Sequence, residues 1–247
     1  MKKAVILSAG QGSRLLPLTA DRPKCLIDFS GKSLIAWQIE SLVANGVDQI
    51  VVVTGFRDGI MNTALAEVAQ SSVSIRTCFN PFYKVADNLG SCWIVRGEMD
   101  QDFIILNGDT LVSPEIVARL IANATMPITV SIDVKDSYDL DDMKVQREGD
   151  RLLQIGKRLD PHESNAESIG MLAFKGEGPT IFRQQVEAMM RTPEGVLNWY
   201  LKAIHALAPS GVVGTVSIEG LPWAEVDFPE DLPIARALTE AWTKSRR

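Results

Sequence analysis

Short runs of apolar residues without polar interruption recur through the first half of the chain. The clearest lie at 4–7 (AVIL), 50–53 (IVVV) and 103–106 (FIIL). A strand with one face in water alternates apolar and polar residues, so an uninterrupted run indicates a strand covered on both faces. Between these runs, apolar residues recur at helical spacing around 35–43 and 60–68. This alternation of buried strands and helices predicts parallel βα units.

The alternation of predicted strands and helices ends after residue 127. We predict strands at 128–134, 143–147, 152–155 and 169–174, joined by short polar turns that suggest antiparallel additions in a partly separate lobe. Helices are expected over about 179–191 and 196–207, and Pro229 opens a last helix in a position that proline favours. No repeat or flexible linker interrupts the 247 residues. The simplest organisation is one α/β domain over 1–247 with an insertion at about 128–175.

The composition and charge of the chain disfavour several classes of protein. The net charge is -6, and no run of Lys or Arg occurs before the charged helix end expected at 244–247. Nucleic-acid binders usually present a basic face, so no nucleic-acid partner is expected. The first apolar stretch is too short for a signal peptide, and no run approaches the roughly 18 residues of a membrane helix. The 3 cysteines lack CxxC spacing, which fits a reducing compartment. We therefore expect a cytoplasmic protein with no membrane partner.

A glycine-rich loop follows the first strand. It reads Ser8-Ala-Gly-Gln-Gly-Ser-Arg14, with Arg-Pro-Lys24 further on. The glycines let the backbone approach a ligand closely, and exposed N–H groups there can hold phosphate. Arg14 and Lys24 add positive charge suited to a triphosphate. The alternative is an ordinary surface turn, which the coincidence of glycines, Arg and Pro-Lys after a strand disfavours. The predicted nucleotide-binding residues are Ser8, Ala9, Gly10, Gln11, Gly12 and Ser13.

Two other phosphate motifs are absent. The loop lacks the Gly-Lys-Ser/Thr of a Walker A motif, and position 15 is Leu where a dinucleotide fingerprint needs a small residue. The pattern Ala-Gly-x-Gly-Ser-Arg14 followed by Pro-Lys24 resembles the signature of the nucleotidyltransferase superfamily of sugar-phosphate nucleotidylyltransferases. The resemblance covers essentially the whole chain. It implies an α/β fold with a three-layer, Rossmann-like mixed sheet and a partly antiparallel insertion lobe. It also implies that the loop wraps the phosphates of an NTP.

Two acidic residues follow predicted strands. Asp109 ends Leu-Asn-Gly-Asp, just past a buried strand and at the sheet edge where ligands bind. Asp227 ends Trp-Ala-Glu-Val-Asp, before the last helix. The alternatives are a turn for Asp109 and a helix cap for Asp227. By the resemblance, both coordinate Mg²⁺, and Asp227 is preferred over Glu225. Magnesium usually takes one or two carboxylates plus substrate phosphates. The predicted catalytic residues are Arg14, Lys24, Asp109 and Asp227.

These residues permit chemistry without a general base. A phosphate monoester carries a charge of about −1.5 to −2 at pH 7, so its oxygen is already a nucleophile. The enzyme must supply in-line placement and neutralise crowded negative charge. His162 and His205 stand isolated and are assigned to the surface or to packing. We expect transfer of a nucleoside monophosphate from an NTP to a small phosphorylated acceptor, with release of pyrophosphate.

The stretch Asp-Asn-Leu-Gly-Ser-Cys-Trp at 87–93 is predicted to lie near the base. Gly90 permits close approach, and Asn88 and Ser91 offer hydrogen bonds. The alternative is a helix N-terminus with polar caps. The form Asn-x-Gly-Ser-x-Trp resembles the phosphocholine and aminoethylphosphonate cytidylyltransferases, which implies CTP.

Three further stretches, at 141–145, 155–157 and 167–170, resemble the same branch in order and spacing. By matching position, Lys157 is predicted to hold the acceptor phosphate, with Lys144 as a second candidate. Acids between 136 and 142 suit an acceptor amine, or are simply a solvated loop. Aromatic residues, Trp199 among them, suit a cage for a quaternary ammonium such as choline, or core packing. The predicted acceptor-binding residues are Lys157, Lys144, Asp142, Glu167 and Trp223.

Two other functions stay open. A sugar-1-phosphate nucleotidylyltransferase using UTP, GTP or dTTP explains the loop and both acids equally well. A non-catalytic nucleotide sensor of the same fold is disfavoured, because a sensor could lose the metal-binding acids. The sequence leaves the acceptor open, and it is compatible with a homodimer.

Overall fold

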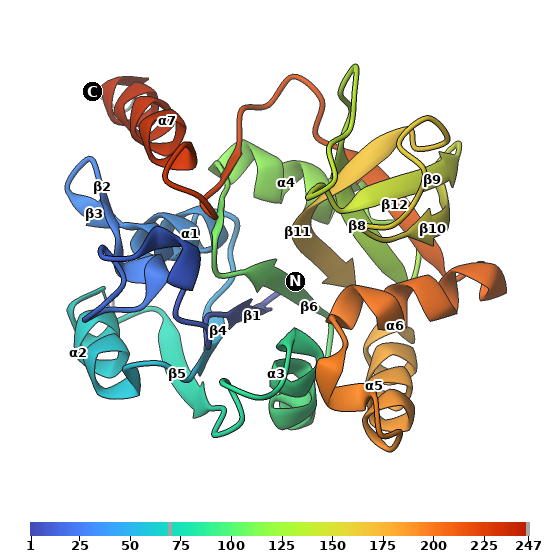
Figure 1. The fold of residues 1–247 in the computed structure, drawn as a ribbon, viewed down its shortest axis with the longest axis horizontal. Helices are drawn as coiled ribbons and strands as arrows, with labels where there is room; N and C mark the ends of the chain where they lie inside the picture. Colours follow the sequence, from blue (N-terminus) through green and yellow to red (C-terminus); the bar gives the residue numbers. More distant parts are fainter. Residues whose placement is uncertain (69–70, 246–247) are drawn as a thin grey trace. The chain divides into compact units, whose positions relative to one another are not determined.

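The computed structural model describes residues 1–68 and 71–245 (Figure 1). Contacts divide the chain into two compact units. The N-terminal unit comprises residues 2–84, 106–118 and 221–247, and the central unit comprises residues 1, 85–105 and 119–220. β6 (Phe103–Asn107) and α4 (Pro114–Asn123) each begin in one unit and end in the other. The predicted single domain with an insertion at about 128–175 stays a prediction.

The N-terminal unit contains three parallel strands: β1 (Lys3–Leu7), β4 (Gln49–Thr54) and β5 (Ser74–Phe79). β1 pairs with β4 from Lys3↔Gln49 to Leu7↔Val53, and β4 pairs with β5 along its whole length. β4 is central and buried, as its unbroken apolar sequence predicts. The predicted parallel βα units are confirmed here.

Helices α1 (Leu34–Val43) and α2 (Asp58–Val68) alternate with these strands (Figure 1). The Ser33 hydroxyl accepts a hydrogen bond from the Ala36 amide and so begins α1. The hairpin of β2 (Asp28–Phe29) and β3 (Lys32–Ser33) precedes α1. The Trp37 indole of α1 donates to the Phe29 carbonyl, which fixes this helix to the hairpin.

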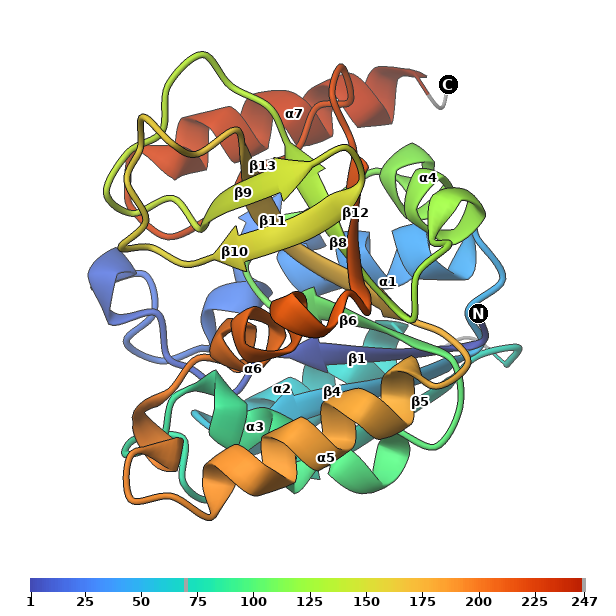
Figure 2. The ribbon, with the colours of Figure 1, turned by 90° about the vertical axis from the view of Figure 1, so that its right-hand side faces the viewer.

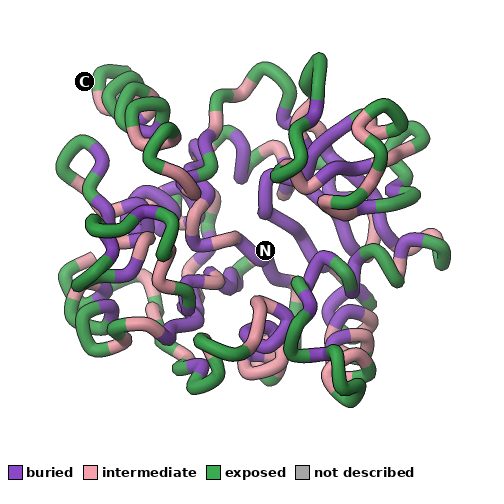
Figure 3. The backbone as a smooth tube through the Cα atoms, viewed as in Figure 1, coloured by how far each residue is buried: buried purple, intermediate pink, exposed green. Residues whose placement is uncertain are grey.

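The last helix, α7 (Asp231–Ser245), packs on this unit through one face. Figure 3 shows most of α7 exposed, and its buried residues are Ala235 and Thr239. The chain's last two residues, part of the predicted charged end, lie outside the described residues. Two very short strands, β7 (Thr110–Leu111) and β13 (Ala224–Glu225), pair antiparallel. A buried apolar cluster unites the loop, the β7 segment and the β13 segment: Leu15, Ile27, Phe29, Trp37, Leu111, Val226 and Ala235.

The central unit has a mixed sheet (Figure 2). β8 (Ile128–Asp133) pairs antiparallel with β11 (Ala166–Phe174) and parallel with β12 (Val213–Ser217). β9 (Lys144–Glu148) pairs antiparallel with both β10 (Arg151–Ile155) and β11. The predicted antiparallel additions are confirmed. Helices α3 (Asn88–Ile94), α5 (Gly178–Met190) and α6 (Tyr200–Leu207) pack on one another.

The structure corrects several element bounds. The helix predicted over 196–207 begins at Tyr200, because Trp199 has extended backbone angles and residues 195–197 form a separate 3-10 turn. The last helix begins at Asp231 instead of Pro229. Helix α4 was not predicted. Among the described residues, no helix combines the length and apolar character of a membrane span.

Candidate active site

The loop after β1 is held by hydrogen bonds from its own residues. Thr19 is buried, and its hydroxyl donates to the Gly12 carbonyl at 2.8 Å. The Gln11 side-chain amide donates to the Thr19 carbonyl at 3.2 Å. The Phe56 amide donates to the Ala9 carbonyl at 2.9 Å, which ties the loop to the end of β4. The loop is therefore fixed in shape by the N-terminal unit alone.

The side chain of Lys24 passes directly over Gly12. Its φ is 76°, in the left-handed region that glycine adopts readily. A Cβ atom at this position would lie 2.7 Å from Lys24 Cβ and 2.9 Å from Lys24 Cδ. Glycine is thus required both for the backbone angle and for the course of the lysine side chain. Gly10 differs, because a Cβ atom there would meet nothing within 4 Å.

The two predicted acids are brought together by the smallest strands of the fold. β7 follows Asp109 directly, β13 lies two residues before Asp227, and the two strands pair with the register Glu225↔Thr110. The Val226 amide donates to the Asp109 carbonyl at 3.0 Å. The Asp231 carboxylate accepts the amides of residues 227 and 228, both at 2.7 Å. Asp231, which the sequence analysis missed, thereby shapes the turn that carries Asp227.

The charged side chains from the loop meet these acids. Lys24 Nζ lies 2.9 Å from Asp109 Oδ2 and 2.5 Å from Asp227 Oδ1. Arg14 Nη1 lies 3.2 Å from Asp227 Oδ2, and its guanidinium stacks on the Phe228 ring at 4.9 Å. Burial lowers the pKa of Lys24, but the charges of the two carboxylates outweigh burial and raise that pKa above its usual range. All four predicted catalytic residues therefore form one cluster within the N-terminal unit.

The donor set of this cluster fits a hard divalent cation. One carboxylate oxygen each from Asp109, Glu225 and Asp227 lie within 4.8 Å of one another. Carboxylate oxygens suit Mg²⁺, which usually takes one or two of them and completes its shell with waters and substrate phosphates. Glu225 is exposed and joins the group that the sequence analysis limited to the two aspartates.

A small cavity of about 120 Å³ connects the glycine loop with this cluster. Its lining includes Ser8, Gly10, Gly12, Lys24 and Asp109. The predicted phosphate loop and the predicted metal residue thus face the same space. A Cβ at the buried Gly108 would lie 2.4 Å from Ser8 Oγ, so glycine is needed for this close approach.

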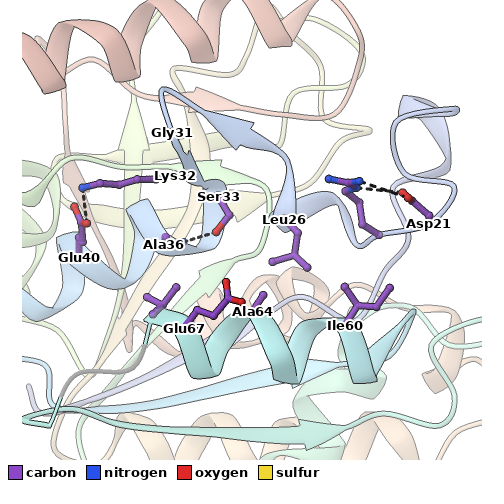
Figure 4. Close-up of a pocket in the computed structure, with 12 residues that line it drawn as sticks. Asp21, Leu26, Gly31, Lys32, Ser33, Ala36, Glu40, Ile60, Ala64 and Glu67 are labelled. Atoms are coloured by element: carbon purple, nitrogen blue, oxygen red, sulfur yellow. Dashed lines mark hydrogen bonds and ion pairs between the residues drawn. The ribbon is translucent and has the colours of Figure 1, made fainter.

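A larger hollow of about 750 Å³ lies elsewhere in the N-terminal unit, against α1 and α2 (Figure 4). Four of its charged side chains are paired with one another, Arg22 with Asp21 and Lys32 with Glu40. None of the predicted site residues lines it. Size alone therefore does not mark the candidate site in this unit.

The residues predicted near the base lie in the central unit. The Asn88 side-chain oxygen accepts the Tyr200 amide at 2.8 Å and thus caps α6. The carboxylate of Asp87 accepts the Asn88 amide at 2.8 Å and caps α3. Gly90 and Ser91 are buried in α3. The capping alternative describes these contacts, and base recognition by Asn88, Gly90 and Ser91 stays a prediction.

The two lysines predicted for the acceptor phosphate differ in surroundings. Lys157 Nζ lies over the Trp199 ring, 5.4 Å from its centroid. Lys144 is buried, and its Nζ donates to the carbonyls of Asp139 and Asp142 at 2.7 and 3.4 Å. Phosphate contact by either lysine stays a prediction, and the geometry favours Lys157 because the Lys144 ammonium is held inside its own turn.

Of the acids predicted for an acceptor amine, Asp142 already binds a cation of this chain, together with Glu167, another predicted acceptor residue. Lys135 Nζ lies 2.8 Å from Asp142 Oδ2 and 2.9 Å from Glu167 Oε2. Burial raises the pKa of Glu167 to about 7 despite this lysine. Lys135 is a residue that the sequence analysis missed, because its pairing with Glu167 depends on the contact of β8 with β11. Trp223, the remaining predicted residue, is partly buried in the N-terminal unit.

The chain is similar to several known proteins. The chain is 26% identical to a CTP:phosphoglutamine cytidylyltransferase of Campylobacter jejuni, over 94% of this chain and 98% of that protein. It is 30% identical to a CMP-5'-(3-aminopropyl)phosphonate synthase of Streptomyces rubellomurinus, over 93% of this chain but only 37% of that longer protein.

Among solved structures, the inositol-1-phosphate CTP transferase of T. maritima is similar, with a TM-score of 0.80, 21% identity and coverage of 97% of this chain and 96% of that one. This similarity confirms the predicted Rossmann-like α/β fold with a mixed sheet. The profile of the nucleotidyl transferase family matches residues 3–140, which include the glycine loop, Lys24 and Asp109. Because this match spans more than half of the chain, the chain belongs to the nucleotidyl transferase family.

Proposed function

We propose that this nucleotidyltransferase transfers CMP from CTP to a small phosphorylated or phosphonate acceptor and releases pyrophosphate. The observation that carries the proposal is the bridge of Lys24 between Asp109 and Asp227, beside the glycine loop. Two relatives named for CMP transfer align over more than nine-tenths of the chain.

The triphosphate is assigned to the N-terminal unit. The loop at 8–13 offers backbone amides to the phosphates, and Arg14 and Lys24 offer charge-assisted hydrogen bonds. Asp109 and Asp227, together with Glu225, would hold Mg²⁺. A magnesium ion bound there supplies neutralisation of the charge that builds on the α-phosphate.

The reaction is an in-line displacement. An oxygen of the acceptor phosphate or phosphonate forms a bond to the α-phosphorus of CTP, and the bond to the β-bridging oxygen breaks. The electron pair leaves with pyrophosphate. The acceptor oxygen is already anionic at neutral pH, so no side chain needs to remove a proton. The residues of the cluster act by placing and neutralising charge.

The acceptor is assigned to the central unit, around the insertion at about 128–175. Lys157 is the preferred holder of the acceptor phosphate, because its ammonium lies at a hollow and not inside a turn. Lys144, Asp142 and Glu167 complete the proposed acceptor residues of this unit, and Trp223, the other predicted residue, belongs to the N-terminal unit. To bind Asp142 and Glu167, the cationic group of a phosphocholine-type acceptor would have to displace Lys135 from them.

The base is assigned to Asn88, Gly90 and Ser91. A site built for the donor and acceptor pattern of cytosine leaves buried groups unpaired with uracil, at a cost of about 1–3 kcal/mol per lost partner. The test is kcat/KM for CTP and UTP with one accepted phosphate ester. We expect CTP to be preferred at least about tenfold. Equal values or a UTP preference would contradict CTP specificity and favour the sugar-1-phosphate nucleotidylyltransferases.

The proposed cellular compartment rests on the cysteines. Cys25 and Cys92 are free, buried thiols, and burial raises the pKa of Cys25 to about 12. Free thiols are typical of reducing compartments, so we assign the enzyme to the cytoplasm.

A further inference from the structure

The central unit contains a hollow of about 430 Å³ at the end of β10. The turn at 156–159 and the first half of α6 form its sides, and Lys157 belongs to its lining. Sites for small molecules commonly have volumes of about 300–1,000 Å³. The hollow is therefore large enough for the organic part of an acceptor whose phosphate is held by Lys157.

The floor of the hollow is apolar. Ile155 and Leu201 are almost fully buried there, with 3% and 5% of their surface exposed. Leu159 and the indole of Trp199 add apolar walls. A ligand body of methylene groups would be desolvated by this surface.

The charged groups of the lining are all basic or titratable to a cation. Besides Lys157 they are Arg158, Lys202 and His205, and no acid is among the described residues that line the hollow. The Lys202 ammonium donates to Asn198 Oδ1 at 2.8 Å, which uses one of its three donors. His205 Nδ1 lies 3.0 Å from the Ile155 carbonyl oxygen, which fixes the ring at the hollow's edge.

The ring of Trp199 could attract a cationic ligand, but a cation of the protein already lies over it. The Lys157 ammonium lies 5.4 Å from the centroid of the Trp199 ring. One acid outside the lining, Asp87, interacts with Lys157 and with the side chain of Trp199. A quaternary ammonium entering the hollow would meet like charge.

From this lining we infer that the hollow binds the organic body of the acceptor, and that this body is apolar with an anionic end, such as a carboxylate. The inference rests on the proposed function through Lys157. It separates the acceptor from phosphocholine, whose body ends in a cation.

The test uses three phosphate esters of similar size: those of 4-hydroxybutanoate, 1-butanol and choline. Their bodies are anionic, neutral and cationic. With CTP and Mg²⁺, we expect kcat/KM for pyrophosphate release to fall in that order, by tenfold or more between the first and the last. Binding of each ester without nucleotide is followed by tryptophan fluorescence.

Arg158→Met combined with Lys202→Met should weaken binding of the anionic ester at least tenfold and leave the butyl ester unchanged. Arg151→Met is the matched control, because Arg151 is an exposed cation of β10 outside the lining. Equal or tighter binding of phosphocholine, or loss of butyl ester binding in the double variant, would overturn the inference. Binding of the anionic ester without turnover of any ester would instead contradict the proposed function and leave the hollow's specificity standing.

Discussion

The ammonium nitrogen of Lys24 lies 2.9 Å from Oδ2 of Asp109, although 85 residues separate the two in the sequence. The same nitrogen contacts Asp227, so it occupies carboxylate oxygens that a divalent cation would also bind. Lys24 therefore holds the two acids together and competes with a metal for them.

The first prediction follows from this competition. Lys24→Met should bind Mn²⁺, a spectroscopic substitute for Mg²⁺, about tenfold more tightly in the absence of nucleotide, because hydrogen bonds to charged groups contribute about 1.5–3 kcal/mol. Turnover should fall, because the lysine is also assigned to the phosphates. Electron paramagnetic resonance measures the free Mn²⁺. Lys32→Met removes an equal charge from the pair with Glu40 and is the control. Unchanged or weaker Mn²⁺ binding in Lys24→Met would contradict the competition.

The second prediction concerns the acids. Asp109→Asn and Asp227→Asn remove charge with little change of volume, and each should lower turnover by at least about a hundredfold. Circular dichroism should show an intact fold. Asp48→Asn, in a pair with Lys2 at 3.4 Å, should keep full turnover. Full activity of either site variant with magnesium present would remove that residue from the metal site.

The third prediction separates the two glycines of the loop. Gly12→Ala should destabilise the fold by about 1–2 kcal/mol, because its backbone is left-handed. It should also weaken NTP binding, because the new methyl group would displace the Lys24 side chain. Gly10→Ala should leave stability unchanged, since nothing lies within 4 Å of the added atom. Urea unfolding and nucleotide titration measure both effects. Equal stability of the two variants would show that Gly12 can be replaced without strain.

The fourth prediction concerns pH. The pKa of Glu167 is raised from 4.5 to about 7, so the native state holds a proton that the unfolded chain has lost across this window. The stability contributed by the raised pKa is present below pH 4.5 and is lost as the pH rises through 7. The pKa of Asp142 is lowered and that of Lys135 is raised, so both side chains stay charged over this pH range. They therefore contribute little to the change of folding stability with pH.

Wild-type protein should therefore lose stability relative to Glu167→Gln between pH 4.5 and 7, as urea unfolding at each pH would show. Glu163→Gln, at an exposed acid of the same unit, should follow the wild type. Parallel curves for wild type and Glu167→Gln would mean that this glutamate titrates normally.

Much of the N-terminal unit could be predicted because its signals are local. The uninterrupted runs of β1 and β4 and the glycines after β1 report burial and backbone shape within a few residues. The pairing of β7 with β13 could not be predicted, since strands of two residues carry no periodicity. Helix α4 does carry a signal, a proline at its first position, that the prediction left unused.

The proximity of the four predicted catalytic residues could also be predicted from local patterns, whereas their roles stay predictions. Arg14, Lys24 and Asp109 stand in recognisable patterns, so their types and order were enough to group them. Lys135 lies 2.9 Å from Glu167 only because the folded chain brings them together, whereas Asp231 accepts the amide of Asp227, four residues before it, at 2.7 Å, a local capping contact that the sequence analysis missed. A sequence shows which residues can carry charge, but the tertiary contacts decide which of those charges are already neutralised.

The N-terminal unit is assembled from three separate stretches of the chain, and each contributes one member of the charged cluster: Lys24, Asp109 and Asp227. A continuous fragment must therefore span at least residues 24–227 to contain all three. A polypeptide that ends before residue 227 lacks one of the two carboxylates assigned to the metal, so we expect it to be inactive. Cleavage of the chain near residue 220 should yield two inactive fragments. Activity recovered on mixing them would measure how far the fragments reassemble.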